Sequence, residues 1–429
     1  MRITIRAGRV IDPANGVDRV QDLHIAEGRI FALGAAPDGF SADQIISAEA
    51  RIVCPGLVDL CARLREPGAE HKATIASETA AAASAGITSL CCPPDTHPAI
   101  DTPAVAELIH QRAEHAGQAR VYTLGALTKG LAGTHLSEMI SLKEAGCVGL
   151  SNGLQPISNT QVMRRAMEYA ATHGLTVFLH AEDAWLRNRG CAHEGAVSTR
   201  LGLPGIPESA ETAAVARDLI LIEQTGVRAH FAHLSSARAA QMVGRAQHDG
   251  LPVSADVSAH HLHLTEMDVS DFNSDCHVIP PLRTMRDRDG LRKGLAAGVI
   301  SAVCSDHQPH DADAKLSPFM TTAPGISALE TLLPLTLHLV NEGVLSLSEA
   351  LARLTHLPAQ ILGIDAGSLA VGKIADICIF DPDHYWTFDK THMQSRGKNS
   401  PFTGWEFKGR VTHTLLGGRL VYALQPCSR

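Results

Sequence analysis

Leu-Thr-Val-Phe-Leu-His, residues 175–180, is a short apolar run that ends in a histidine. Runs of this length with polar flanks are typical of strands buried in a parallel sheet. Seven similar runs occur at 57–60, 87–92, 120–125, 147–150, 228–233, 251–257 and 299–304. Helical patterns separate many of them, at 70–84, 103–116, 211–225 and 327–340. Eight β/α units predict a TIM-type (β/α)8 barrel, an α/β fold whose functional side chains lie at the carboxyl ends of the strands.

The two ends of the chain have a different texture from its middle. Ile3 and Ile5 alternate with polar residues, and the segments 374–380 and 411–421 are also typical of short strands. Each end alone is too small to bury a sheet face, so we expect both termini to pair into one small β-sandwich. The predicted organisation is therefore an N-terminal sandwich part, a barrel and a C-terminal sandwich part, at residues 1–54, 55–365 and 366–429.

Composition excludes several classes of protein. The 429 residues carry a net charge of −8, which argues against nucleic acid or an anionic membrane surface as a partner. The first residues lack the apolar core of a signal peptide, and no apolar run is long enough for a membrane span. The ten cysteines form no Cys-x-x-Cys motif, which favours reduced, buried thiols. We therefore expect a cytoplasmic protein that binds neither nucleic acid nor membrane.

Polar residues close three of the predicted strands. His180 and His233 end the fifth and sixth strands, and Asp306 follows the eighth. A single histidine in an apolar strand is more often a satisfied core residue than a ligand. Three metal-ligating residue types at the same end of one barrel are a sharper indication of a metal-dependent site.

The chain resembles the dihydroorotases of the amidohydrolase superfamily over nearly its whole length. The matching segments, in order, are Pro-Gly-Leu-Val-Asp (55–59), Leu-Arg-Glu-Pro-Gly (64–68), Ala-Gly-Ile-Thr-Ser (85–89), Leu-Gly-Leu-Pro-Gly-Ile-Pro (201–207), His-His-Leu-His-Leu-Thr (260–265), Pro-Pro-Leu-Arg (280–283), Ser-Asp-His-Gln-Pro-His (305–310), the run 323–335 and Lys-Asn-Ser-Pro-Phe (398–402). This resemblance implies the same barrel and a place in pyrimidine biosynthesis.

An active dihydroorotase reversibly closes carbamoyl-aspartate into dihydroorotate. The resemblance implies zinc held by a first-strand His-x-His, a carboxylate near strand four, the strand-five and strand-six histidines and the strand-eight aspartate, which is also the general base. His180, His233 and Asp306 match this set. The His-x-His positions are instead Cys61 and Arg63, and a guanidinium has no usable lone pair for zinc.

Other positions of the site also differ from the residues that the dihydroorotases carry there. The family's strand-four Asp-Asp-Gly is replaced by a segment that begins with Asn152, so the bridging carboxylate is absent. Among the positions that contact substrate, Arg65 remains. Asp95 and Ile279 replace two asparagines, and Asp95 puts a negative group where a substrate carboxylate would lie. Metal and substrate contacts are lost together, which predicts a pseudoenzyme without zinc.

Arg63 suggests what replaced the metal. Without zinc, Asp306 would be an unpaired carboxylate in a semi-buried pocket, at a cost of several kcal/mol. We therefore predict that Arg63 pairs with Asp306 and fills the metal site. In one alternative, Arg63 points to solvent at the barrel mouth. In another, Cys61 joins His180, His233 and Asp306 in a mononuclear metal site.

The resemblance is most specific to inactive dihydroorotase homologues of some bacteria. These serve as the non-catalytic chain that aspartate transcarbamoylase needs for assembly or activity. This implies the transcarbamoylase catalytic chain as partner, with this chain as a homo-oligomer inside the larger complex. Two rivals remain: an active zinc-dependent cyclic amidohydrolase (dihydroorotase or hydantoinase type) with an atypical metal site, and a ligand-sensing pseudoenzyme that uses Arg65.

Residues 311–322 are polar and poorly patterned, which predicts disorder or partner contact there.

Overall fold

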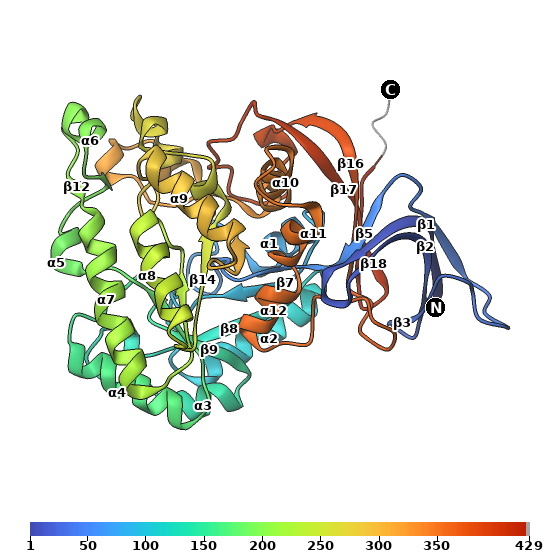
Figure 1. The fold of residues 1–429 in the computed structure, drawn as a ribbon, viewed down its shortest axis with the longest axis horizontal. Coiled ribbons are helices and arrows are strands. Elements are labelled where there is room, and N and C mark those ends of the chain that lie inside the picture. The colour runs from blue at the N-terminus through green and yellow to red at the C-terminus, as the bar shows by residue number, and fades with distance from the viewer. Residues whose placement is uncertain (426–429) are drawn as a thin grey trace.

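The barrel is built from eight parallel strands in sequential order. The computed structural model describes residues 1–425 (Figure 1). The strands run in the order β15-β14-β13-β10-β9-β8-β7-β6. They are β6 (Leu57–Asp59), β7 (Ile87–Cys92), β8 (Arg120–Ala126), β9 (Cys147–Ser151), β10 (Val177–His180), β13 (Ala229–Ala232), β14 (Val253–Ser258) and β15 (Ala302–Cys304). Each overlaps one of the eight predicted runs, so the predicted barrel is confirmed.

Two contacts join the first and last strands and bring their ends together. At the amino end, Val58 N–H donates to Leu354 O (2.8 Å), and Val303 N–H donates to the adjoining Arg353 O (3.2 Å). At the carboxyl end, Arg63 N–H donates to His307 O (2.9 Å). The backbone after β6 therefore lies directly beside the backbone after β15.

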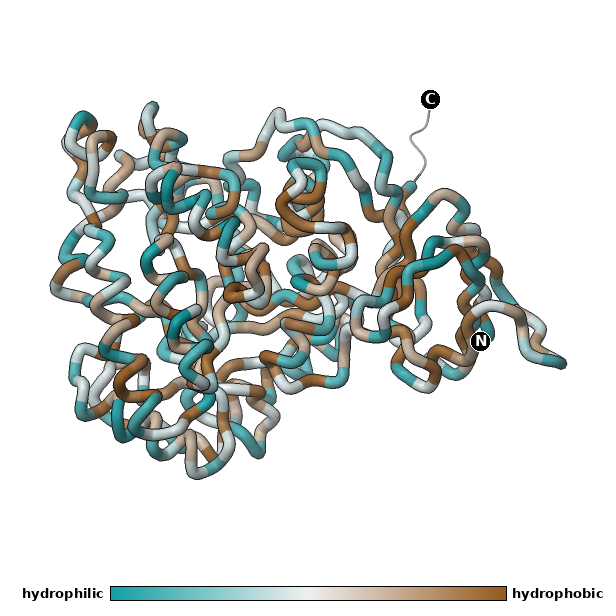
Figure 2. Tube along the Cα trace, viewed as in Figure 1, coloured by the Kyte–Doolittle hydropathy of each residue, from teal (hydrophilic) through white to brown (hydrophobic). Residues whose placement is uncertain are grey.

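Helices surround the strands, and apolar side chains fill the space between the two layers (Figures 1 and 2). The main helices are α1 (Ile75–Ser84), α2 (Pro103–Ala116), α3 (Met139–Glu144), α4 (Thr160–Thr172), α7 (Glu208–Thr225), α8 (Ala237–His248), α9 (Met285–Ala296) and α10 (Leu332–Asn341). Short helices α5 (Ala184–Arg187), α6 (Ala196–Leu201), α11 (Leu347–Ala352) and α12 (His356–Leu362) complete the set.

The helix prediction failed mainly at boundaries. Helix α2 has its predicted limits, whereas α1 begins at Ile75 rather than residue 70. Thr74 caps α1 by accepting the Ser77 N–H (3.1 Å), and the Glu66 carboxylate accepts the Ile75 N–H (2.7 Å). These acceptors satisfy amide groups that a helix start leaves without partners, so the helix begins at them.

Both termini form one further sheet, with strand order β18-β17-β16-β5-β1-β2-β3 and β4 paired to β1. These strands are β1 (Arg2–Asp12), β2 (Val17–Ala26), β3 (Arg29–Leu33), β4 (Gln44–Ser47), β5 (Ile52–Pro55), β16 (Ile377–Thr387), β17 (Glu406–Leu416) and β18 (Arg419–Ala423). Strand β5 pairs with β1 and with β16, which joins the two ends of the chain as predicted. The sheet curls over its own core, which includes Ile5, Leu23 and Ile379.

Residues 311–322 are ordered, so the predicted disorder is wrong. They form two 3-10 turns, Ala312–Lys315 and Phe319–Thr321. The Phe319 ring stacks on the His277 ring with centroids 4.8 Å apart, and the Thr322 hydroxyl is 2.8 Å from His277 Nδ1. One buried aromatic ring therefore anchors a segment whose polar composition gave no pattern. Contact of this segment with a partner stays a prediction.

Two expectations from composition can be compared with the structure: buried, reduced cysteines and the lack of a membrane-spanning segment. The nine cysteines among residues 1–425 are buried and free. Over the same residues, no helix combines the length and apolar character needed to cross a membrane.

Candidate functional site

Arg63 lies at the centre of the carboxyl face of the barrel. Its side chain is 5% exposed. Nη1 lies 2.8 Å from Asp306 Oδ1, and Nε lies 2.8 Å from Asp95 Oδ2. The predicted pair with Asp306 is confirmed, and the alternative in which Arg63 points to solvent is wrong. The sequence did not reveal that Asp95 is the second partner of Arg63.

The charges of this cluster explain why it is stable inside the barrel. Burial disfavours the charged form of Arg63, but the nearby carboxylates of Asp95 and Asp306, together with Cys61, raise its pKa above the ordinary value. The guanidinium therefore stays charged and compensates both carboxylates. An arginine offers a planar fork of donors, which suits a site with two acceptors on different sides.

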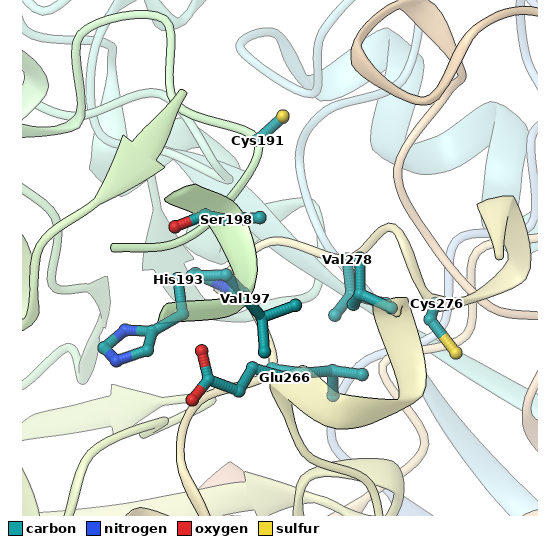
Figure 3. A pocket seen from close by; sticks show the side chains of 11 residues that line it. Cys191, His193, Val197, Ser198, Glu266, Cys276 and Val278 are labelled. Carbon is teal, nitrogen blue, oxygen red and sulfur yellow. The ribbon is translucent and has the colours of Figure 1, made fainter. Parts of the chain in front are cut away.

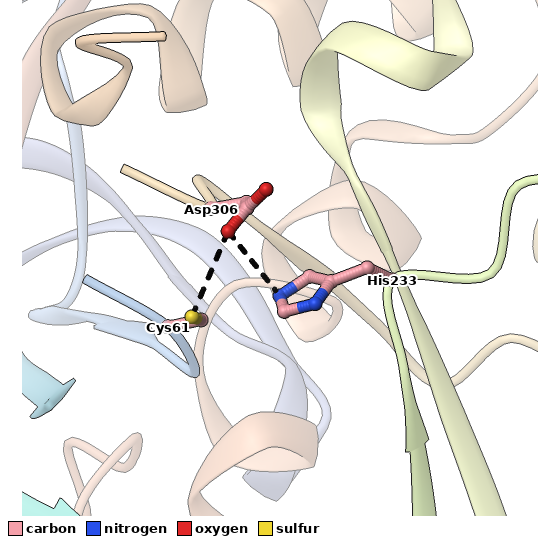
Figure 4. A group of neighbouring side chains, drawn as sticks. All are labelled: Cys61, His233 and Asp306. Atoms are coloured by element: carbon pink, nitrogen blue, oxygen red, sulfur yellow. Dashed lines mark hydrogen bonds and ion pairs between the residues drawn. The ribbon is translucent and has the colours of Figure 1, made fainter. Parts of the chain in front are cut away.

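Asp306 is held from several directions. Its Oδ1 accepts from Arg63, and Gln308 Nε2 lies 3.2 Å from each carboxylate oxygen. Cys61 Sγ and His233 Nε2 each lie 3.8 Å from Asp306 Oδ1 (Figure 4). The structure thus brings together four residues that the sequence singled out, Cys61, Arg63, His233 and Asp306, and it adds Gln308 to them.

These residues do not fit a tightly held zinc ion. One ligand atom each from Cys61, His233 and Asp306 lies within 4.8 Å of the others. However, Arg63 Nη1 is 2.8 Å from Asp306 Oδ1 and 3.6 Å from Cys61 Sγ, so a positive charge already lies among the three groups. Burial also raises the pKa of the Cys61 thiol well above its ordinary value, whereas zinc binds the thiolate.

Asn152 has a structural role in place of the strand-four carboxylate. Its Oδ1 accepts from the Thr128 hydroxyl (2.7 Å), and its Nδ2 donates to Leu131 O (3.1 Å) and Gln155 O (2.9 Å). The amide nitrogen is therefore committed as a donor to two backbone carbonyls. A carboxylate at this position would lose both bonds, so the local loop has adapted to the amide.

The two remaining histidines face a small cavity. His180 Nε2, which lies 3.5 Å from Glu182 Oε2, and both ring nitrogens of His233 are buried without a hydrogen-bond partner in the described chain. They line a cavity of about 30 Å³ together with Arg63 and Phe178. This volume corresponds to about one water molecule of bulk liquid, whereas ligand pockets are typically about 300–1,000 Å³. The cavity is therefore much smaller than a typical ligand pocket.

The positions that match the family's substrate contacts interact with other groups of this chain. Arg65 Nε donates to Pro309 O (2.9 Å), and Nη2 lies 3.2 Å from His310 Nε2. Burial and the charge of Arg63 lower the pKa of Arg65 to about 10. Ile279 is buried, and the carboxylate of Asp95 is bound to Arg63. Of these positions, only Arg65 retains a group suited to an anionic substrate.

Backbone strain persists at this end of the barrel. Arg65, His233 and Asp306 have φ values of 63°, 57° and 45°, in the left-handed region that residues other than glycine rarely adopt. Such conformations cost about 1–3 kcal/mol each and cluster at functional sites. The carboxyl end of the barrel therefore carries the kind of strained backbone that is common at functional sites.

A neighbouring cavity provides no second ligand site. His193 and Glu266 line it beside Val197 and Val278 (Figure 3), and its volume is about 10 Å³. Burial lowers the pKa of His193 to about 4, and His193 Nδ1 lies 3.3 Å from Arg283 Nη1. His193 is therefore a neutral packing residue.

Asp59 links the first strand to the eighth beneath the site. Its carboxylate accepts the Ser305 N–H (2.8 Å) and the Ser305 hydroxyl. Burial raises the pKa of Asp59 to about 7, although these hydrogen bonds oppose the shift. The folded state therefore holds this proton at pH values where the unfolded chain, with a pKa of about 3.9, has lost it.

We predict a measurable pH dependence of stability from Asp59. The raised pKa contributes stability that is present below about pH 4 and is lost as the pH rises through about 7. In Asp59→Asn this contribution is absent. The free energy of unfolding of the native chain should therefore fall, relative to that of the variant, between pH 4 and pH 7. Urea unfolding at several pH values checks this, and parallel pH profiles for the two proteins would contradict it.

Comparison with known proteins agrees with the fold. The family described as Dihydro-orotase-like matches residues 50–239. A dihydroorotase-like protein of Pseudomonas putida is 53% identical over 98% of this chain and 99% of the relative, and one from Pseudomonas aeruginosa is 52% identical over 98% and 100%. A dihydroorotase from a Geobacter strain is 43% identical over 98% and 99%.

The solved structure of L-hydantoinase from Arthrobacter aurescens has the same fold, with a TM-score of 0.87, 24% identity and coverage of 99% of this chain and 97% of the hydantoinase. The relatives span both this chain and themselves almost completely, so the likeness extends to the small sheet as well as the barrel. The chain belongs to the dihydroorotase-like family.

Proposed function

We propose that this protein is a non-catalytic member of its family and a structural partner of aspartate transcarbamoylase. The proposal that the chain is non-catalytic rests on the position of Arg63. Its guanidinium pairs with Asp306 and Asp95 at the centre of the catalytic face. Arg63 supplies a positive charge where the family's metal would lie, and it binds two carboxylates. This arrangement supports a site that stabilises the fold rather than one that binds a catalytic metal.

The energetic argument supports the same proposal. Bound metal lowers the pKa of water from about 15.7 to about 7, and loss of that shift corresponds to roughly 12 kcal/mol at about 1.36 kcal/mol per unit. His233 and Asp306 are the groups left near this place, and Asp306 is neutralised by Arg63. The Asp306 carboxylate is bound by Arg63, and His233 supplies no cation, so the remaining residues do not replace the metal.

The partner is proposed from the resemblance to inactive homologues that assemble with aspartate transcarbamoylase. Two of the most similar relatives carry the description dihydroorotase-like rather than dihydroorotase, which fits a divergent group within the family. The intact barrel supports a scaffold role, since the buried core and the strand ends are retained while the chemistry is lost. The assembly would contain several copies of this chain and of the transcarbamoylase catalytic chain.

Co-expression with the transcarbamoylase of the same organism tests this role. We expect the two chains to elute together in gel filtration, and we expect transcarbamoylase activity to depend on the presence of this chain. Arg63→Lys, which keeps a charge at the catalytic face, serves as a control for effects of the old site. A transcarbamoylase that is equally assembled and equally active alone would rule out the scaffold role.

One observation favours a second candidate, an active zinc-dependent cyclic amidohydrolase. Cys61, His233 and Asp306 present ligand atoms within 4.8 Å of one another, and the imidazole nitrogens of His233 have no partner in the described chain. Metal analysis and turnover of dihydroorotate decide between the two. Stoichiometric zinc, with activity that is abolished in His233→Ala, would establish the enzyme and reject the pseudoenzyme.

A further inference from the structure

A second cluster of metal-ligating side chains joins the end of α10 to the segment after β14. His338 and Glu342 are four residues apart at the carboxyl end of α10, and His263 follows the 3-10 turn Ala259–Leu262 after β14. One ligand atom from each lies within 4.8 Å of the others, and His338 Nε2 is 3.9 Å from Glu342 Oε1. Residues at i and i+4 of a helix share one face, so both side chains point toward His263.

The orientation of His263 is fixed by its second ring nitrogen. His263 Nε2 lies 2.9 Å from the backbone oxygen of Leu335, which can only accept a hydrogen bond. The ring hydrogen is therefore on Nε2, and Nδ1 carries the lone pair that can bind a metal. Histidine ligands of metals in proteins almost always donate their other N–H to a carbonyl or carboxylate in this way.

A cation already lies beside this cluster. Arg292 Nη2, from α9, is 3.0 Å from Glu342 Oε2 and 3.4 Å from His263 Nδ1. As Arg63 does at the catalytic face, Arg292 competes with a metal ion for these groups, so an ion can bind only if Arg292 moves. The Arg292 side chain is 16% exposed, against 5% for Arg63, and the neighbouring Glu342 and His338 side chains are 37% and 43% exposed. Because the guanidinium is a rigid plane, an ion that takes this position requires Arg292 to adopt another rotamer and give up the bond from its Nε to Leu262 O (2.6 Å).

We propose that His263 Nδ1, His338 Nε2 and the Glu342 carboxylate form a binding site for one divalent transition-metal ion of the zinc class. Two imidazoles and one carboxylate are a common zinc ligand set, and water would complete the tetrahedron. The ion would displace the Arg292 guanidinium from Glu342. It would tie the carboxyl end of α10 to the segment after β14, which both α9 and α10 contact. This site is independent of the proposed function.

Zinc titration of the untagged, chelator-treated protein tests the site. We expect competition with a chromophoric chelator to show one tight equivalent per chain, and zinc to raise the melting temperature. His338→Ala should weaken this binding at least about tenfold and abolish the thermal shift. His338 is half-exposed, so the alanine variant should remain folded, as circular dichroism would verify. Arg292→Met should bind zinc more tightly, because the competing cation is gone.

Matched variants separate this site from other histidines. His248 is 89% exposed and lies 3.5 Å from Asp249, so His248→Ala controls for loss of a surface histidine beside a carboxylate. It should bind zinc as the native chain does. Absence of tight zinc in the native chain, or equal affinity in His338→Ala, would overturn the proposal. Loss of zinc in His233→Ala with retention in His338→Ala would place the metal at the catalytic face and also overturn it.

Discussion

Arg63→Met should lower the free energy of unfolding by about 3–5 kcal/mol, the range typical of a broken buried ion pair. Methionine has a similar length but leaves Asp306, which is 1% exposed, without its cation. Asp95 also loses its partner, although at 21% exposed it can be hydrated in part. Chemical unfolding monitored by fluorescence or circular dichroism measures the change.

Two controls separate the buried charge from loss of a side chain. Arg9→Met removes an exposed pair with Asp18, whose partners are 49% and 42% exposed, and should cost less than about 1 kcal/mol. The double variant Arg63→Met/Asp306→Asn removes both charges and should recover a large part of the loss. Equal instability of the single and double variants would show that the packing of Arg63, rather than its charge, stabilises the site.

Restoration of the family's ligand set should convert the catalytic face into a zinc site. The variant carries Cys61→His, Arg63→His and Asn152→Asp, in a His338→Ala background that removes the surface cluster. Loss of a group that merely hydrogen-bonds to a metal ligand costs about 10–100-fold in metal affinity, so return of three ligands together with removal of a cation should gain more than about 100-fold. Competition with a chromophoric chelator measures the gain.

This restored variant should still lack dihydroorotase activity, because Ile279 and Asp95 remain at the substrate-contact positions. His233→Ala added to it should remove the zinc again, which verifies the location. The Asn152→Asp substitution removes two hydrogen bonds to backbone carbonyls, so a modest loss of stability is expected. Unchanged zinc affinity would mean that the backbone of the site does not place the restored side chains in the geometry that zinc needs. Turnover of dihydroorotate would show that the substrate contacts were retained.

Much of the fold could be predicted from local pattern. Eight apolar runs gave the eight barrel strands, because a strand buried on both faces must be apolar throughout. Helix limits were less predictable: α1 begins where Thr74 and Glu66 provide acceptors, and one of these lies outside the helix pattern. Residues 311–322 were missed because their order depends on Phe319 packing on His277, a contact between distant parts of the chain.

The sequence by itself determined which ligands the site has lost, since Cys61, Arg63 and Asn152 stand where His-x-His and a carboxylate would be. It also suggested the pair between Arg63 and Asp306, because a buried carboxylate requires a compensating charge. Only the tertiary structure decided that Asp95 is the second partner of Arg63 and that Asn152 is bound by a loop. It alone brought His263 beside His338 and Glu342. These contacts join residues far apart in sequence, and their distances are set by how the strands and helices pack rather than by any local pattern.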